Sequence, residues 1–324
     1  MTDLIYSAVG QFTSVRDPYL EDHFVARLFR PGGDAATARA RFAAFLKDRP
    51  LLPLLLAGLA RARAAIGDGA GAIPVVDCGV FMGNFSVATA LQAARAGLPV
   101  EITAYEANPA LADPIRANMA LYDLEVAVHA NGIGGDYGTL KFAHAEGGLI
   151  GGTLFMPNRK EETGPGATTV DCAVIPLRDA LPPELAPGLV KIDIEGNEVA
   201  AFGSIIGDAG RINNVWFVEF APFQARLTVG ASGGGASGGG ASAGGASAGG
   251  GMCYGDFLLA RYAVFDVGSW LWVPHVRRLR DLAALEDCLK AGDARAHNTD
   301  LLLIPQDMAD LVAEVDALAS ARAG

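Results

Sequence analysis

The sequence predicts an α/β fold in which a mostly parallel sheet carries helices on both faces. Three observations support this class. From about Pro74 onward, short apolar runs of strand length alternate with longer segments of helical periodicity. A glycine-bounded turn follows the first apolar run, and a carboxylate follows the second. This alternation indicates right-handed βαβ units, which bind ligands at the carboxyl ends of their strands.

The first half of the expected domain holds strands and helices in strict alternation. Their expected ranges are strand 75–78, helix 84–96, strand 100–105, helix 111–122 and strand 125–130. An extended excursion then interrupts the alternation, with strand-like runs at 139–142 and 168–174 around a glycine-rich loop. We therefore expect the excursion to leave the main sheet and the chain to return to it afterwards.

The alternation resumes in the second half of the chain. The expected ranges are a strand-like run at 189–196, a helix at 197–206, a strand at 215–220, a helix at 254–260 and extended runs at 263–267 and 299–304. The part after residue 251 is too short for a convincing independent domain. We expect its extended runs to complete the same sheet as an antiparallel edge hairpin.

Two segments differ from this pattern. Residues 1–70 are rich in Ala, Leu and Arg at helical spacing, which predicts a helical N-terminal extension or cap before a main domain at 71–324. Closure of an active site is the alternative role for this extension. Residues 230–251 repeat Ala-Ser pairs within glycine and have no large apolar side chain to bury, so a flexible insertion is expected there.

Composition limits the classes of function. A formal net charge of -11 disfavours nucleic acid as a partner, because no surplus of Lys and Arg exists to neutralise phosphates. The strongest apolar run, 51–60, is about half the length that crosses a bilayer, and the N-terminus lacks the features of a signal peptide. The four cysteines lack C-x-x-C spacing, which favours structural thiols in a reducing compartment. A cytoplasmic protein without a membrane partner is expected.

The turn after the first strand has the composition of a nucleotide-type site. Gly79 and Gly83 bracket the turn, and their missing Cβ atoms let the backbone approach a ligand closely. Asn84 and Phe85 open the next helix, whose free N–H groups favour a carboxylate or phosphate. Glu106 ends the second strand and can accept hydrogen bonds from two adjacent ribose hydroxyls. An adenosine-bearing cofactor is the first hypothesis.

The spacing of this turn favours S-adenosylmethionine over a dinucleotide. Dinucleotide folds normally carry G-x-G-x-x-G, whereas here Gly79-x-x-x-Gly83 follows Asp77. The Asp77 carboxylate is unfavourable beside a pyrophosphate but favourable beside a sulfonium or ammonium group. A tight strand-to-helix turn without a ligand is the alternative.

Carboxylates also end two later strands. Asp193 and Glu195 alternate on one strand and so share a face, and Glu219 is expected to end the adjacent strand. Convergent carboxylates at this edge can act as a general base or anchor an acceptor hydroxyl. A divalent-metal site and a structural role in capping the next helix are the alternatives for Asp193 and Glu195. Glu198 is expected to complement the dipole of that helix, and neither His129 nor His144 has metal-ligand spacing.

The motifs together resemble the FkbM-type S-adenosylmethionine-dependent methyltransferases over roughly residues 75–305. Five sequence blocks carry the resemblance, and the block that contains Lys191 is the most specific of these. All five blocks occur in the order that the family shows. They are Asp77-x-Gly79-x-x-x-Gly83, Tyr105-Glu106-Ala107-Asn108-Pro109 followed by Asn118, Asn131-Gly132-Ile133-Gly134-Gly135, Lys191-Ile192-Asp193-Ile194-Glu195-Gly196-Asn197-Glu198, and Val218-Glu219.

The resemblance implies a Rossmann-like class I methyltransferase fold that binds S-adenosyl-L-methionine. It assigns cofactor contacts to the first three blocks, and so adds Asn108, Asn131, Gly132 and Ile133 to the candidate site. The implied reaction is O-methylation of a small-molecule acceptor, a hydroxylated metabolite such as a sugar or polyketide. The chain departs from the family at Phe81, where Asn is common, and in the glycine-rich insertion.

Two other classes of function are the alternatives. The first is a noncatalytic cofactor-binding or interaction protein on the same scaffold. The second is a NAD-dependent oxidoreductase, because Tyr137-x-x-x-Lys141 has the spacing of the short-chain dehydrogenase pair. That pair needs a helix, whereas residues 139–142 are expected to be extended, which would hold the two Cα atoms roughly 13 Å apart.

Overall fold

The structure is a computed structural model that describes residues 50–68, 71–81, 83–120, 122–144, 168–194, 196–229, 252–268, 276–287 and 299–323. Residues 1–49 of the expected N-terminal extension and the glycine-rich insertion at 230–251 lie outside these residues. So does Glu195.

The central element is an eight-stranded sheet, with strand order β12-β11-β13-β8-β7-β1-β2-β3. Strands β3, β2, β1, β7 and β8 pair in parallel, whereas β8, β13, β11 and β12 pair antiparallel in that order. Their bounds are β1 Ile73–Cys78, β2 Val100–Tyr105, β3 Ala127–His129, β7 Leu189–Ile192, β8 Val215–Phe220, β11 Tyr262–Gly268, β12 Arg277–Leu279 and β13 Thr299–Pro305. This is the mostly parallel, Rossmann-like α/β sheet that the sequence predicts. The expected antiparallel pairing of the two C-terminal runs is confirmed by β11 and β13. The outer edge of the sheet, however, is β12 and not this pair.

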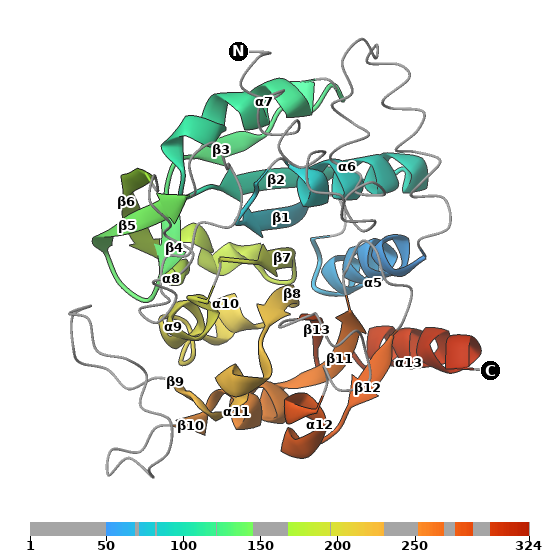
Figure 1. The fold of residues 1–324 in the computed structure, drawn as a ribbon. Coiled ribbons are helices and arrows are strands. Elements are labelled where there is room, and N and C mark those ends of the chain that lie inside the picture. Colours follow the sequence, from blue (N-terminus) through green and yellow to red (C-terminus); the bar gives the residue numbers. More distant parts are fainter. Residues whose placement is uncertain are drawn as a thin grey trace, which may run out of the picture.

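Helices cover both faces of the sheet (Figure 1). One face packs against α5 Leu51–Ala65, α6 Asn84–Ala96, α7 Ala112–Ala120 and α13 Ala309–Ala323. The other packs against α8 Leu177–Ala180, α9 Glu198–Gly203, α11 Tyr254–Arg261 and α12 Leu282–Glu286, with α10 Ala209–Ile212 at its border. The remaining short elements are η1 Pro109–Leu111, η2 Pro183–Leu185, η3 Pro222–Arg226, β9 Thr228–Val229 and β10 Met252–Cys253.

The sheet has one hydrophobic core on each face, and successive side chains of β8 point into the two cores in turn. Phe217 points into the first core, where its ring meets the edge of Phe85 from α6 at 5.9 Å between centroids. Trp216 points into the second core and packs on Phe202 of α9 at 4.9 Å. Both faces of this strand are therefore buried, which explains its continuous apolar sequence.

Helix α5 is part of the first core. Leu55, Leu56 and Leu59 are fully buried in it. Gly58 lies so close to Leu311 of α13 that an added Cβ would come within 2.5 Å of that side chain. This stretch of the expected N-terminal extension thus packs directly on the sheet and on the C-terminal helix.

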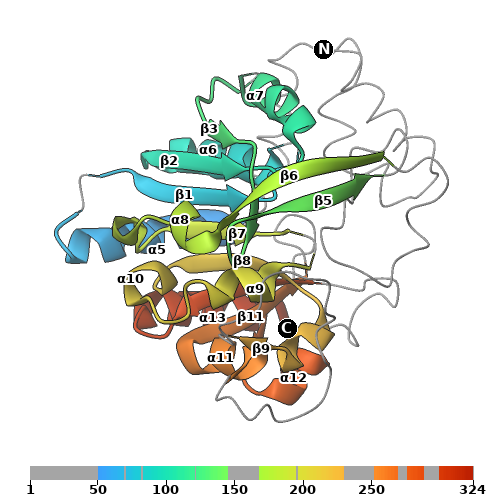
Figure 2. The same ribbon diagram turned by 90° about the vertical axis from the view of Figure 1, so that its left-hand side faces the viewer.

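The extended excursion forms a second, three-stranded sheet in the order β4-β6-β5. Its strands are β4 Gly132–Gly134, β5 Gly138–His144 and β6 Thr168–Pro176. Figure 2 shows β5 and β6 extending away from the central sheet. Because β5 is a strand, Tyr137 and Lys141 lack the helical spacing that a short-chain dehydrogenase pair requires.

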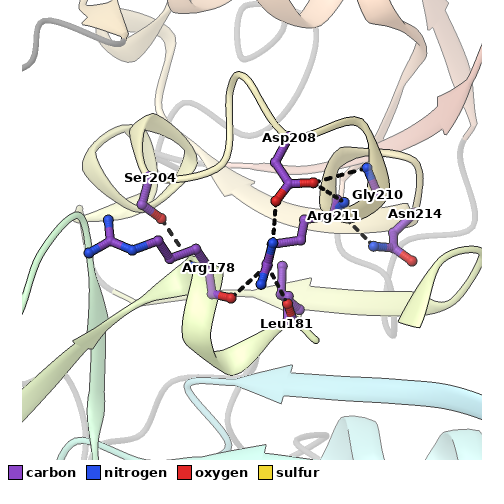
Figure 3. Close-up of polar contacts among 7 residues, drawn as sticks. All are labelled: Arg178, Leu181, Ser204, Asp208, Gly210, Arg211 and Asn214. Atoms are coloured by element: carbon purple, nitrogen blue, oxygen red, sulfur yellow. Dashed lines mark hydrogen bonds and ion pairs between the residues drawn. The ribbon is translucent and has the colours of Figure 1, made fainter. Parts of the chain in front are cut away.

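At the amino ends of β7 and β8, a polar cluster fixes the entry of both strands (Figure 3). The Asn214 amide accepts from Gly188 N–H at 2.7 Å and donates to Arg211 O at 2.7 Å. Arg211 Nε donates to the carbonyls of Arg178 and Leu181, and Asp208 caps α10 through Gly210 N–H. This cluster is at the edge of the sheet opposite to the carboxyl ends of its parallel strands.

The length and apolar character of the described helices decide whether one of them could cross a membrane. Within this part of the chain, none combines the length and the apolar character that crossing a membrane requires.

We expect Leu55→Ala to lower the free energy of unfolding by about 2–5 kcal/mol, because it leaves a cavity between α5 and the sheet. Ile66→Ala, which changes an exposed side chain just after α5, is the control and should stay within about 0.5 kcal/mol of the parent. Urea denaturation followed by circular dichroism measures both. Equal, small effects would contradict the packing of α5 described above.

Candidate active site

The candidate site lies where β1, β2, β7 and β8 end, at the carboxyl edge of the sheet. The turn from Gly79 to Gly83 connects β1 to α6 there. Both glycines have positive φ, at 79° and 86°. The turn is closed by hydrogen bonds from Gly79 N–H to Tyr105 O at 2.9 Å and from Gly83 N–H to Val80 O at 2.9 Å. The predicted glycine turn is thus held against the end of β2.

Gly79 also makes a close backbone contact with the loop after β7. A Cβ at this position would lie 1.7 Å from Asp193 O, and Asp193 N–H donates to Cys78 O at 3.1 Å. Glycine is therefore required at position 79 by the packing of two loops, in addition to any ligand. This contact brings Asp193 beside the glycine turn.

Asp77 is fully buried behind the turn. Its Oδ2 accepts from Ser86 Oγ of α6 at 2.7 Å, and its Oδ1 lies 3.9 Å from Lys191 Nζ. Burial raises the pKa of Asp77, although Lys191 and the Ser86 hydroxyl oppose that effect. Asp77 thus joins the start of α6 to the sheet and to Lys191.

Lys191 is the residue of this site to which the sequence analysis gave no role. Its Nζ donates to Gly79 O at 3.0 Å and lies 3.1 Å from Asp193 Oδ2. Burial acts to lower the pKa of Lys191, but the carboxylates of Asp193 and Asp77 outweigh it and the pKa lies above its usual value. A lysine within the apolar strand Leu189–Ile192 was the available signal, because a buried lysine needs an acidic partner.

Glu106 follows β2 and is only 6% exposed. Its two carboxylate oxygens accept from different backbone groups, Oε2 from Phe81 N–H at 3.0 Å and Oε1 from Asn108 N–H at 2.9 Å. Burial raises the pKa of Glu106, and these two hydrogen bonds oppose that effect. The carboxylate is therefore held in a fixed orientation beside the glycine turn, with an acceptor position left on each oxygen.

Phe81 occupies the left-handed region, with φ of 52°. Asn adopts this conformation more readily than Phe. The contact from position 81 to Glu106 uses the backbone N–H, which any residue except proline provides. Phenylalanine at this position therefore strains the turn more than asparagine would and preserves this hydrogen bond.

The other predicted cofactor residues divide into buried and partly exposed groups. The side chains of Phe85 and Ile133 lie in the two cores, and Asn108 is also buried. Gly132 packs against Cys172 and Ala107. At Phe85, Gly132 and Ile133, a ligand would therefore contact backbone atoms. Asn131, between β3 and β4, is half-buried. The Oδ1 atom of Asn84 is buried and has no hydrogen-bond partner among the described residues.

Glu219 lies on β8, whereas Asp193 directly follows β7, because this strand ends at Ile192 and not beyond Asp193 as expected. The Asp193 side chain is 36% exposed and paired with Lys191. The parallel register of β7 and β8 pairs Ile192 with Val218, so Asp193 and Glu219 follow at the same level on the same face of the sheet. In turn, Glu219 is opposite Asp300 of β13. Sequence reasoning did not single out Asp300, because its strand partner is distant along the chain.

Across the described residues, no three His, Cys, Asp or Glu side chains are placed together as metal ligands. His129 is exposed at the end of β3 and stacks on Tyr105, with 4.9 Å between ring centroids.

Comparisons with known proteins give two weak structural likenesses. No protein-family model and no curated protein matches the chain. A TehB-like SAM-dependent methyltransferase from Corynebacterium glutamicum has 10% identity and a TM-score of 0.27, with 76% of this chain and 87% of that chain covered. An uncharacterized ACR superfamily protein from Burkholderia thailandensis has 16% identity and a TM-score of 0.24, with 68% and 63% covered. Similarities at this level establish neither a family nor an activity for this chain.

We expect Gly79→Ala to destabilise the protein by about 2–6 kcal/mol, because it combines left-handed strain with overlap on Asp193 O. Gly97→Ala is the matched control. Gly97 also has positive φ, at 66°, but a Cβ there meets no atom within 4 Å, so only strain of about 1–2 kcal/mol is expected. Denaturant unfolding of both variants separates the two effects. Equal losses would show that the approach of the two loops is unimportant.

Proposed function

We propose that this protein is an S-adenosylmethionine-dependent methyltransferase, with the cofactor bound between the glycine turn and Glu106. The orientation of the Glu106 carboxylate is the observation that carries the proposal. Phe81 N–H and Asn108 N–H hold its two oxygens side by side at the end of β2. A carboxylate held in this way can accept one hydrogen bond on each oxygen from the two adjacent hydroxyls of a ribose.

The charges around the turn support a cationic cofactor. Asp77 and Asp193 flank Lys191, and Glu106 adds a third carboxylate at the same edge. A pyrophosphate would meet this negative surplus, whereas a sulfonium or ammonium group is attracted by it. The same charges therefore favour S-adenosylmethionine over a nicotinamide dinucleotide.

The backbone and one orphaned side-chain atom fit such a cofactor. Gly83, at the end of the glycine turn, caps α6 in the left-handed conformation. Free N–H groups at a helix start can bind a carboxylate. Beside them, the buried Asn84 Oδ1 lacks a partner among the described residues and can accept from an ammonium group.

When bound, S-adenosylmethionine supplies an electrophilic methyl group on a good leaving group. The residues of the chain then have to position an acceptor and manage its proton. Asp193 is exposed enough to meet an acceptor, and Lys191 holds its carboxylate at 3.1 Å. We infer that Asp193 accepts the proton of an acceptor hydroxyl or aligns that hydroxyl, with Glu219 and Glu195 as the next candidates.

The reaction we propose is O-methylation of a small hydroxylated metabolite such as a sugar or polyketide. A carboxylate base suits a hydroxyl acceptor, because the hydroxyl proton has to leave during methyl transfer. The net charge of -11 favours a neutral or cationic small acceptor over nucleic acid.

We expect Glu106→Ala to weaken S-adenosylmethionine binding by about ten- to a hundredfold, the scale for losing hydrogen bonds to a charged group. Isothermal titration calorimetry measures this effect. Asp113→Asn, on the exposed surface of α7, is the control and should bind as the parent does. Unchanged affinity in Glu106→Ala would remove the assignment of the ribose to this carboxylate.

We expect the affinity of the parent protein to fall as the pH is lowered through the raised pKa of Glu106. The ionised carboxylate is the form that accepts two hydroxyls, so binding is strongest above that pKa and weakens below it. Titrations across acidic pH, compared with Glu106→Gln, isolate this group. If the two proteins show the same pH dependence, another group is responsible.

We expect Asp193→Asn to reduce kcat by about a hundredfold or more, the usual scale for general acid-base catalysis, while cofactor affinity is kept. Methyl transfer from labelled S-adenosylmethionine to a panel of hydroxylated metabolites provides the assay, with solvent hydrolysis subtracted. A defect restored by added divalent cation would instead support a metal role.

Asp208→Asn is the matched control for this experiment. The Asp208 side chain is 37% exposed and paired with Arg211, compared with 36% and Lys191 for Asp193. It lies in the polar cluster at the amino edge (Figure 3) and should leave kcat unchanged. An equal loss of kcat in both variants would show that the effect comes from general destabilisation.

A further inference from the structure

A buried carboxylate supports the loop that carries Asp193. Glu198, at the start of α9, is only 1% exposed. Its Oε1 accepts from Ile194 N–H at 3.0 Å and from Gly196 N–H at 3.2 Å. Both donors belong to the loop between β7 and α9, so Glu198 fixes the backbone directly after Asp193.

Gln224 extends this network to the next strand. This residue of η3 is 2% exposed, and its Nε2 donates to Glu198 Oε2 at 2.8 Å. Its Oε1 accepts from Ala221 N–H at 2.9 Å. Ala221 directly follows β8, the strand that contains Glu219. Glu198 and Gln224 therefore form a bridge between the segments that follow β7 and β8.

Glu198 lies in the first turn of α9, as expected, and its carboxylate also accepts hydrogen bonds from outside that helix. Ile194 and Gly196 both precede α9, which spans only Glu198–Gly203. The carboxylate thus acts on the loop outside the helix. Burying a carboxylate is costly unless its oxygens are hydrogen-bonded, and here both oxygens have partners.

We propose that Glu198 and Gln224 are positioning residues, which set the place of Asp193 relative to Glu219 without touching the substrate. This inference rests on the proposed methyltransferase function. Asp193 and Glu219 follow at the same level on adjacent strands, and each is within a few residues of one end of the bridge. Glu106, the proposed cofactor residue, directly follows β2, which is two strands away from β7 in the sheet. The bridge therefore acts on the acceptor side of the site.

Exchanging the two side chains tests the bridge without changing its shape. In Glu198→Gln, an amide replaces the carboxylate, so an N–H donor must face either Gln224 Nε2 or a backbone N–H. In Gln224→Glu, two carboxylates face each other. The double variant Glu198→Gln/Gln224→Glu restores every pair, because the amide at 198 donates to the carboxylate at 224 while both backbone groups keep an acceptor.

Amide hydrogen exchange and kcat are the two quantities to measure in the single and double variants. In each single variant, we expect faster amide hydrogen exchange at Ile194 and Gly196, a fall in kcat of about tenfold or more, and S-adenosylmethionine affinity within twofold of the parent. The double variant should recover slow exchange and most of kcat. Failure of the double variant to recover slow exchange would overturn the proposed bridge. Recovery of slow exchange without recovery of kcat would leave the bridge purely structural and overturn its positioning role.

Asn214→Asp is the matched control. It exchanges a fully buried amide for a carboxylate and removes the hydrogen bond to Arg211 O at the amino edge (Figure 3). We expect a lower Tm but slow exchange at Ile194 and Gly196. Rapid exchange there in this control would contradict a local effect of the bridge. If the parent transfers no methyl group, the proposed function fails, whereas the exchange measurements still decide whether the bridge exists.

Discussion

The close approach of the loops after β1 and β7 determines the geometry of the site. Gly79 meets the Asp193 backbone where no Cβ fits, and Lys191 donates to Gly79 O while pairing with Asp193. A buried ammonium without acidic partners is unfavourable, so Lys191 requires the carboxylates around it. The glycine turn, the start of α6 and the acidic loop after β7 therefore take their positions together. A change in one of them is expected to displace the others.

The candidate site has two sides, and each side contains its own carboxylates. Glu106 and the glycine turn form the side at β1 and β2, and backbone N–H groups fix the Glu106 carboxylate. Asp193 and Glu219 form the side at β7 and β8, with Glu198 and Gln224 buried beneath the loops. Lys191 lies between the two sides. This division allows binding and chemistry to be tested separately.

Much of the fold was predictable because it depends on local patterns. The helix expected at 84–96 and the strand expected at 100–105 match α6 and β2, since their periodicity and flanking glycines are local signals. The place of the glycine turn and Glu106 also followed from the order of strands and turns. Side-chain roles that depend on distant partners were not predictable. The ring of Phe85 packs on Phe217, and Glu198 pairs with Gln224, so both contacts join elements that are far apart in the sequence.

A crystal structure of the full chain with S-adenosylhomocysteine would test the central claim most directly. The account predicts that both ribose hydroxyls lie within hydrogen-bond distance of the Glu106 carboxylate, with the amino-acid part of the ligand against the Gly79–Gly83 turn. A ligand bound away from Glu106, or a turn that closes the site without admitting the ligand, would contradict it.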